Sequence, residues 1–131
     1  MNEKKIFEIL KNTRDRALAN YSHFKVGAVI ISEDEKIFTG HNIESSSYGL
    51  TVCAERVALF KALSEGIRKF KKIYILAEDN DFCPPCGACR QLLIEYAPDI
   101  EVILFTDDMK RKQIKLKELL PLAFTKNRLP E

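Results

Sequence analysis

The sequence predicts an α/β fold, a sandwich of helices around a mixed β-sheet. Three observations indicate it: an amphipathic helical pattern at the N-terminus, a β-branched hairpin after it, and two apolar strands that alternate with helices in the second half. Continuous apolar runs are typical of strands buried on both faces. Alternating strands and helices favour right-handed crossovers, so part of the sheet is expected to be parallel.

The first half contains one helix and one hairpin in this interpretation. Residues 3–19 carry apolar side chains at roughly helical spacing, which predicts an amphipathic helix. The β-branched run KVGAVIIS, residues 25–32, predicts a strand. The polar residues 33–35 then form a turn, and residues 36–44 return as the second strand of the hairpin.

The second half alternates helices with short strands. After a loop, SSSYGL, a helix is expected over residues 53–65, with Gly66 as a plausible stop. The further elements expected are a strand at 71–78, a helix at 86–97, a strand at 101–106, and a short helix at 116–124 that breaks at Pro121. The basic run Lys110, Arg111 and Lys112 is interpreted as a solvated turn.

Length and composition exclude several classes of protein. The 131 residues suffice for one domain, expected over residues 1–131, and no linker or repeat divides them. A net charge of +2 is too small to indicate a nucleic-acid surface. No apolar run is long enough to cross a bilayer, and the charged N-terminal segment lacks the apolar core of a signal peptide. We therefore expect a cytoplasmic protein with no nucleic-acid or membrane partner.

Three of the four cysteines have the spacing of metal ligands. Cys86 and Cys89 form a C-x-x-C pair at the start of a helix, where residues three apart face the same way. Such a pair also occurs in redox proteins, but Cys53 at the start of another helix favours metal. A helix N-terminus favours an anionic thiolate, which Zn²⁺ requires.

Three ligands leave one tetrahedral position open, and an open position distinguishes a catalytic zinc from a structural one. Glu55, two residues after Cys53, is placed to carry a proton from water at that position. Zinc with three thiolates has a net charge of −1, and Arg56 is expected to offset it by hydrogen bonds to sulfur. The alternative is a closed structural site that includes Cys83 as a fourth ligand. Two prolines hold Cys83 and Cys86 in an extended turn, and a closed site would leave Glu55 without a function, so the open site is favoured.

These residues resemble the zinc-dependent nucleoside deaminases, in which C-A-E is followed by P-C-x-x-C. Four ordered blocks are similar to the small homotetrameric cytidine deaminases: YSHFKVGAVI, GHNIESSSYGLTVCAERVALFKAL, PCGACRQ and LLPLAF. The resemblance runs from about Ala17 to Phe124. It implies a three-layer α-β-α sandwich with a mixed five-stranded sheet, one Zn²⁺ per chain, and a homotetramer whose active sites are shared between subunits.

The resemblance also implies an activity, the hydrolysis of cytidine and deoxycytidine to uridine and deoxyuridine plus ammonia in pyrimidine salvage. Zinc-bound hydroxide would attack C4 of the pyrimidine, with Glu55 as the proton shuttle.

Five residues would bind the nucleoside if the family pattern holds. Asn42 and Glu44 would hold the ribose hydroxyls, and residues two apart on a strand do share a face. Phe24 would pack against the nucleoside, and the Ala54 carbonyl would accept a hydrogen bond from the cytosine amino group. Phe124 would stack on the base in a neighbouring subunit's site.

Two other functions stay open. One is a deaminase of a nucleoside antibiotic such as blasticidin S, which resembles this chain in its zinc motifs but lacks the N-x-E pair of Asn42 and Glu44. The other is a non-enzymatic module with a closed four-cysteine zinc site. Cys83 lies outside the family pattern, and SSSY and GAVI depart from it without removing a group that the reaction needs.

Overall fold

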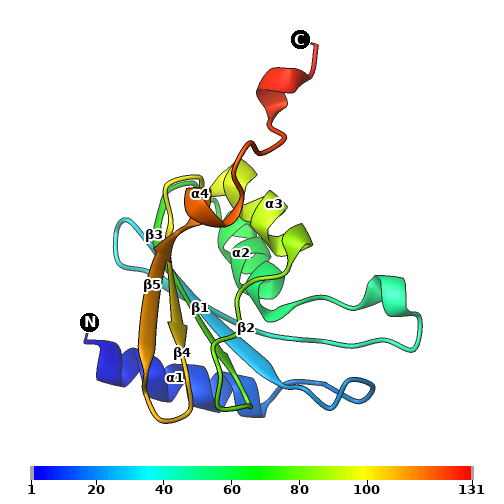
Figure 1. The fold of residues 1–131 in the computed structure, drawn as a ribbon, viewed down its shortest axis with the longest axis vertical. Helices are drawn as coiled ribbons and strands as arrows, with labels where there is room; N and C mark the ends of the chain where they lie inside the picture. The colour runs from blue at the N-terminus through cyan, green and yellow to red at the C-terminus, as the bar shows by residue number, and fades with distance from the viewer. Residues whose placement is uncertain (1, 131) are drawn as a thin grey trace.

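The computed structural model describes residues 2–130, and within them one five-stranded mixed sheet lies between helices (Figure 1). The strand order is β2-β1-β3-β4-β5, and only the β3–β4 pair is parallel. The strands are β1 (Val26–Ser32), β2 (Ile37–His41), β3 (Phe70–Ala77), β4 (Glu101–Phe105) and β5 (Arg111–Lys115). The helices are α1 (Glu3–Asp15), α2 (Ala54–Ser64), α3 (Gly87–Tyr96) and α4 (Leu116–Leu119), with the 3-10 turns η1 (Tyr48–Leu50) and η2 (Lys126–Arg128). The mixed α/β class predicted from the sequence is therefore confirmed.

Helix α1 covers one face of the sheet, and α2 and α3 cover the other (Figure 1). Because side chains alternate along a strand, β1 supplies both layers. Val29 and Ile31 pack with Leu10 of α1, whereas Ala28 and Ile30 pack with the α2 side. The central strands are buried on both faces, which explains why their sequences are continuous apolar runs.

Four expectations about the elements were wrong. The second strand of the hairpin, expected over 36–44, ends at His41, so Asn42 and Glu44 lie beyond it. The first helix ends at Asp15 and not at residue 19, because residues 17–19 leave it and Leu18 forms an isolated bridge with Ile43. The last helix, expected over 116–124, ends at Leu119, ahead of Pro121. The basic run expected to be a turn instead enters a strand, since Arg111 and Lys112 belong to β5.

None of the helices within residues 2–130 combines the length and the apolar character that crossing a bilayer requires.

Candidate metal centre and active site

The N-termini of α2 and α3 meet on the same side of the sheet, and a cysteine directly precedes each helix. Cys53 is the N-cap residue of α2, and Cys86 is the N-cap residue of α3. Cys89 lies in the first turn of α3 and is only 1% exposed. The positive ends of both helix dipoles therefore face the sulfur atoms, which favours the thiolate form.

The three sulfur atoms have the spacing of a thiolate site for zinc. Cys53 Sγ lies 3.7 Å from Cys86 Sγ, and Cys86 Sγ lies 3.4 Å from Cys89 Sγ. All three lie within 4.8 Å of one another. Sulfur atoms that each lie about 2.3 Å from a tetrahedral zinc ion are separated by roughly 3.8 Å. The cluster fits zinc.

The pKa values of two of these thiols are shifted in opposite directions. The pKa of Cys53 is lowered to about 5, first because the Cys89 thiol donates a hydrogen bond to it and further because Arg56 lies beside it. The pKa of Cys89 is raised by the same hydrogen bond and by burial. Cys53 is thus the first of the two to become an anionic ligand.

Glu55 lies beside this cluster and is almost completely buried, with 5% of its surface exposed. Burial raises its pKa to about 7, and the charge of the Cys53 thiolate adds to the effect. A carboxyl group with this pKa can both accept and release a proton near neutral pH, as a general acid–base catalyst must.

Arg56 contacts the cluster through Cys53. Its Nη2 donates to Cys53 Sγ at 3.6 Å and to the Thr51 carbonyl at 3.4 Å. Its Nε is buried and has no hydrogen-bond partner. A guanidinium group so placed would reduce the excess negative charge of three thiolates and one zinc ion.

Cys83 lies near the cluster but outside it. It is not among the sulfur atoms that lie within 4.8 Å of one another. Burial raises its pKa to about 11, which keeps it a neutral thiol. This geometry supports a three-cysteine site with an open position over the closed four-cysteine alternative.

A cavity of about 200 Å³ opens beside the cluster. Its walls bring together all but one of the residues predicted to bind substrate. The lining residues are Ser22, Phe24, Val26, Asn42, Glu44, Thr51, Cys53, Ala54, Glu55, Cys83, Pro84 and Cys86. The exception is Phe124, which is 58% exposed on the C-terminal segment, where its carbonyl accepts a hydrogen bond from Gln91.

Asn42 is engaged with the backbone around the cavity. Its Nδ2 donates to the Phe24 carbonyl at 3.0 Å and to Glu44 Oε2 at 3.1 Å. Its Oδ1 accepts from the Val26 amide at 2.9 Å. Asn42 therefore fixes the start of β1 beside the cavity, in addition to the ribose contact predicted for it.

Glu44 holds the preceding loop in a similar way. Its Oε1 accepts from the amides of Tyr21 and Ser22, at 3.0 and 2.8 Å, and its Oε2 accepts from the Ser22 hydroxyl. The hydrogen bonds from Ser22, first from its hydroxyl, lower the pKa of Glu44 to about 2. Glu44 is thus a permanent anion at the cavity wall.

Ala54 lines the cavity through the start of α2, and its carbonyl oxygen lies against Gly40 of β2. The contact between this carbonyl and the cytosine amino group stays a prediction.

Sequence reasoning missed two residues that shape the site. Ser22 donates to Glu44 and accepts from the Phe24 amide at 3.1 Å. Arg90 donates to the Pro85 carbonyl at 2.8 Å and to the Leu119 carbonyl at 2.9 Å, which fixes the loop before α3. The position of Arg90 directly after Cys89 was the available signal.

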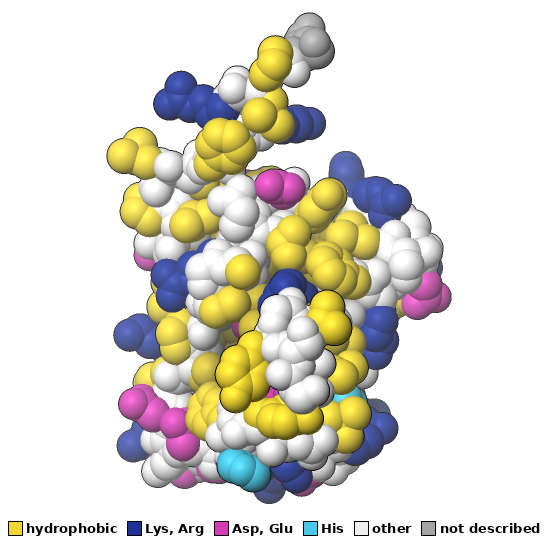
Figure 2. All heavy atoms as spheres, turned by 90° about the vertical axis from the view of Figure 1, so that its right-hand side faces the viewer, with side chains coloured by type: hydrophobic (Ala, Val, Ile, Leu, Met, Phe, Trp, Pro, Cys, Tyr) yellow, Lys and Arg dark blue, Asp and Glu magenta, His cyan; other side chains and the backbone are white. Residues whose placement is uncertain are grey.

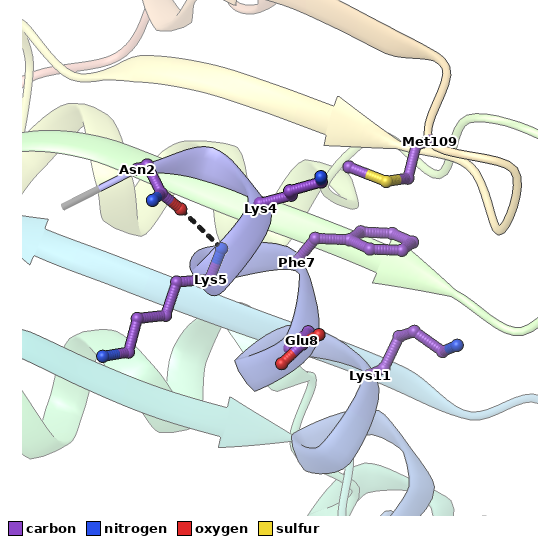
Figure 3. Close-up of a pocket in the computed structure, with 7 residues that line it drawn as sticks. All are labelled: Asn2, Lys4, Lys5, Phe7, Glu8, Lys11 and Met109. Atoms are coloured by element: carbon purple, nitrogen blue, oxygen red, sulfur yellow. Dashed lines mark hydrogen bonds between the residues drawn. The ribbon is translucent and has the colours of Figure 1, made fainter.

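A separate hollow of about 560 Å³ lies over the outer side of α1 and holds none of the predicted site residues (Figure 3). Phe7 and Met109 lie close together there, with Lys4 and Lys11 on the same side of the helix, whereas Lys5 points away from them. It lacks the buried polar groups of a specific site.

A metal-ligating thiol cluster, a buried carboxyl group of raised pKa and an adjoining cavity together define a metal-dependent hydrolytic enzyme. The sequence profile of the cytidine and deoxycytidylate deaminase zinc-binding region matches residues 1–106. The chain belongs to this zinc-binding family.

Individual relatives agree with this assignment. A cytidine deaminase of Halalkalibacterium halodurans is 44% identical over 126 residues, which cover 95% of this chain and 96% of the relative. The crystal structure of a cytidine deaminase from Burkholderia pseudomallei superimposes with a TM-score of 0.90 at 43% identity, covering 95% of this chain and 100% of that one. A blasticidin-S deaminase of Bacillus cereus is 35% identical over 112 residues, or 78% of each chain.

Proposed function

We propose that the protein hydrolyses cytidine and deoxycytidine to the corresponding uracil nucleosides and ammonia. The observation that carries the proposal is the position of Glu55, a buried carboxyl group of raised pKa at the wall of a cavity that also contains Cys53 and Cys86. Family membership and relatives that are cytidine deaminases support the same activity.

Cys53, Cys86 and Cys89 would hold the metal. A zinc ion held there supplies Lewis acidity that makes water a usable nucleophile at neutral pH. Arg56 reduces the negative charge of the thiolates, which would otherwise weaken that acidity.

Glu55 moves the protons. It accepts one proton from the water that attacks C4 of the base and passes it to ring N3. It then accepts the second proton and delivers it to the amino group, so that the C4–N bond breaks and ammonia leaves. Burial raises the pKa of Glu55 to about 7, which suits a group that must both accept and release protons near neutral pH. Burial also excludes bulk water from the carboxyl group.

Asn42, Glu44 and Phe24 would orient the nucleoside. The fixed anion of Glu44 can accept hydrogen bonds from ribose hydroxyls, and the half-buried ring of Phe24 offers an apolar wall. The cavity of about 200 Å³ is smaller than most drug-sized pockets, which run from about 300 Å³ upward. A small molecule is therefore the expected substrate.

We propose that the active site is completed by a neighbouring copy in a homotetramer. Apolar side chains gather on the face that carries η1 and continue onto the C-terminal segment (Figure 2). Its most exposed members are Tyr48 at 78%, Leu50 at 70% and Leu122 at 104%. Exposed apolar side chains that gather on one face are typical of protein–protein interfaces, which supports the proposal, and Phe124 would reach a partner's cavity from this face.

The ligand thiols must stay reduced to bind metal, which supports a cytoplasmic location.

A substrate panel tests the proposed function. Purified zinc-loaded protein is incubated with cytidine, deoxycytidine, CMP and blasticidin S, and loss of the cytosine chromophore is followed. We expect both free nucleosides to be deaminated, and CMP to react poorly because none of the described residues that line the cavity is basic. If blasticidin S alone were turned over, the protein would be an antibiotic deaminase, and the ribose contacts proposed for Asn42 and Glu44 would be wrong.

A further inference from the structure

Gly40 of β2 is the point where the first turn of α2 rests on the sheet. A Cβ atom added at Gly40 would lie 2.5 Å from the Ala58 amide nitrogen and 3.0 Å from Val57 Cβ. It would lie closer still to the carbonyl oxygen of Ala54. Non-bonded carbon atoms normally rest about 3.5–4.0 Å apart, so a side chain here would displace the helix backbone by roughly 1 Å.

The glycine is required by this close approach and not by backbone conformation. Among the described residues, the glycine with a positive φ is Gly66, at 90°. Gly40 lies in regular antiparallel pairing with Ala28 of β1, on the face that packs against α2. An alanine could adopt the same backbone conformation, and only its methyl group would be excluded.

The turn that rests on Gly40 carries the reactive groups. Cys53 caps α2, and Glu55 lies in its first turn. Their partners Cys86 and Cys89 come from a different helix, α3. The depth at which α2 packs on β2 therefore contributes to the distance of 3.7 Å between Cys53 Sγ and Cys86 Sγ.

We propose that Gly40 is a positioning residue for the metal centre and for Glu55. Its missing side chain lets the first turn of α2 pack at the depth that joins Cys53 to the thiols of α3. Gly40 does not line the cavity, so it acts through Cys53 and Glu55. The effect on turnover rests on the proposed function, whereas the effect on metal affinity rests on the thiol geometry alone.

Gly27 offers a matched control on the other face of the sheet. A Cβ atom there would lie 2.8 Å from the Leu10 carbonyl oxygen and 2.9 Å from the Arg14 amide nitrogen, both in α1. Gly27→Ala thus creates the same kind of clash between a strand and a helix, but the displaced helix carries no ligand.

The experiment compares Gly40→Ala with Gly27→Ala in the full chain. Thermal unfolding gives the loss of stability, and competition with a chromophoric chelator gives zinc affinity. The cobalt-substituted forms report thiolate geometry through their absorption spectra, and kcat and KM are measured with cytidine. We expect both variants to lose stability, but only Gly40→Ala to lose zinc affinity, by at least roughly tenfold. Its kcat should fall by about 100-fold, more than KM changes, because the reactive groups are misplaced by roughly 1 Å.

Equal zinc affinities and identical cobalt spectra in the two variants would overturn the proposal and leave Gly40 as a packing residue. A wild-type protein that binds zinc but deaminates no nucleoside would refute the proposed function, while the zinc and cobalt measurements would still decide the role of Gly40.

If either glycine variant does not fold, a pair of smaller substitutions in α2 tests the same proposal. Ala58→Ser and Ala62→Ser each add one atom to a fully buried residue of α2, and Ala58 lies at the contact with Gly40 while Ala62 lies one turn beyond. The proposal requires Ala58→Ser to lower zinc affinity more than Ala62→Ser does. Equal effects would contradict it.

Discussion

Two carboxylates on the cavity wall have pKa values shifted in opposite directions, and their surroundings explain both shifts. Burial raises the pKa of Glu55 to about 7. Hydrogen bonds, first from the Ser22 hydroxyl, lower the pKa of Glu44 to about 2. A desolvated carboxyl group can exchange protons near neutral pH, whereas a carboxylate that accepts several hydrogen bonds stays ionised. At the scale of single residues, one cavity wall thus holds a carboxyl group that can exchange protons and another that stays ionised.

The lowered pKa of Glu44 predicts a pH-dependent contribution to stability. Its folded pKa lies below the usual value of 4.5, so its contribution is fully present above pH 4.5 and is lost as pH falls toward about 2. The unfolding free energies of the wild type and Glu44→Gln should therefore differ above pH 5 and converge toward pH 2. Urea titrations across this range measure it. A difference that stays constant with pH would show that the ionised form contributes nothing.

Cys83 and Cys89 are predicted to differ in their effect on zinc binding. Cys83→Ser should retain one zinc ion per chain, because the Cys83 thiol lies outside the metal-ligating group. Cys89→Ser should lose tight zinc binding, because it removes one of the three thiolates. Metal analysis after dialysis distinguishes them. Loss of zinc from Cys83→Ser would restore the closed four-cysteine alternative.

At the scale of elements, the two sides of the sheet have separate tasks. Helix α1 packs on one face through Ile6, Phe7 and Leu10, on the side of the sheet opposite to α2 and α3 (Figure 1). Helices α2 and α3 pack on the other face and carry the site. The α1 side should therefore contribute stability without directing the chemistry.

Leu10→Ala and Leu59→Ala test this division of tasks. Both side chains are buried, at 0% and 1% exposure, so each truncation should cost about 2–5 kcal/mol of unfolding free energy. Below its unfolding temperature, Leu10→Ala should keep the zinc affinity and kcat of the wild type, whereas Leu59→Ala in α2 should lower them. Equal loss of zinc affinity in both variants would contradict the separation of the two faces.

The elements also show what could be predicted from the sequence. The buried strands β3 and β4 and the helices that begin at Cys53 and Cys86 were predicted within a residue or two, because continuous apolar runs and ligand spacing are local signals. Strand β5 was missed because it is an edge strand whose sequence, RKQIK, is mostly exposed and polar. It pairs with β4, the strand directly before it in the chain, so the missing signal was an apolar pattern in β5 itself.

The site was predicted in the same uneven way. The cluster of three cysteines followed from spacing, and the residues proposed to bind substrate followed from the family resemblance. The loop contacts of Ser22 could not be predicted, since its neighbours in sequence say nothing of Glu44, twenty-two residues later.

At the scale of the whole molecule, the C-terminal segment extends away from the sheet (Figure 1). It exposes Leu122, Phe124 and Leu129, which are 104%, 58% and 58% accessible. We propose that residues 1–131 form one domain and that this segment packs against another copy of it.

A complementation experiment tests whether sites are shared between copies. Phe124→Ala and Glu55→Gln should each have low activity as pure proteins, the first because the base loses an aromatic partner. When the two are dissociated and reassembled together, an intact Phe124 from one chain can complete an intact Glu55 site in another. Activity above the sum of the two pure variants is expected. Activity equal to that sum would show that each chain forms its site alone.

The central claim is that Glu55 moves protons beside an open three-thiolate zinc site. The most direct measurement compares uridine formation from cytidine by the wild type and by Glu55→Gln, with zinc content determined on the same samples. We predict one zinc ion per chain in both proteins and a kcat that falls by roughly 10²–10⁴-fold in the variant. A variant that keeps its zinc and turns over cytidine as fast as the wild type would contradict the account.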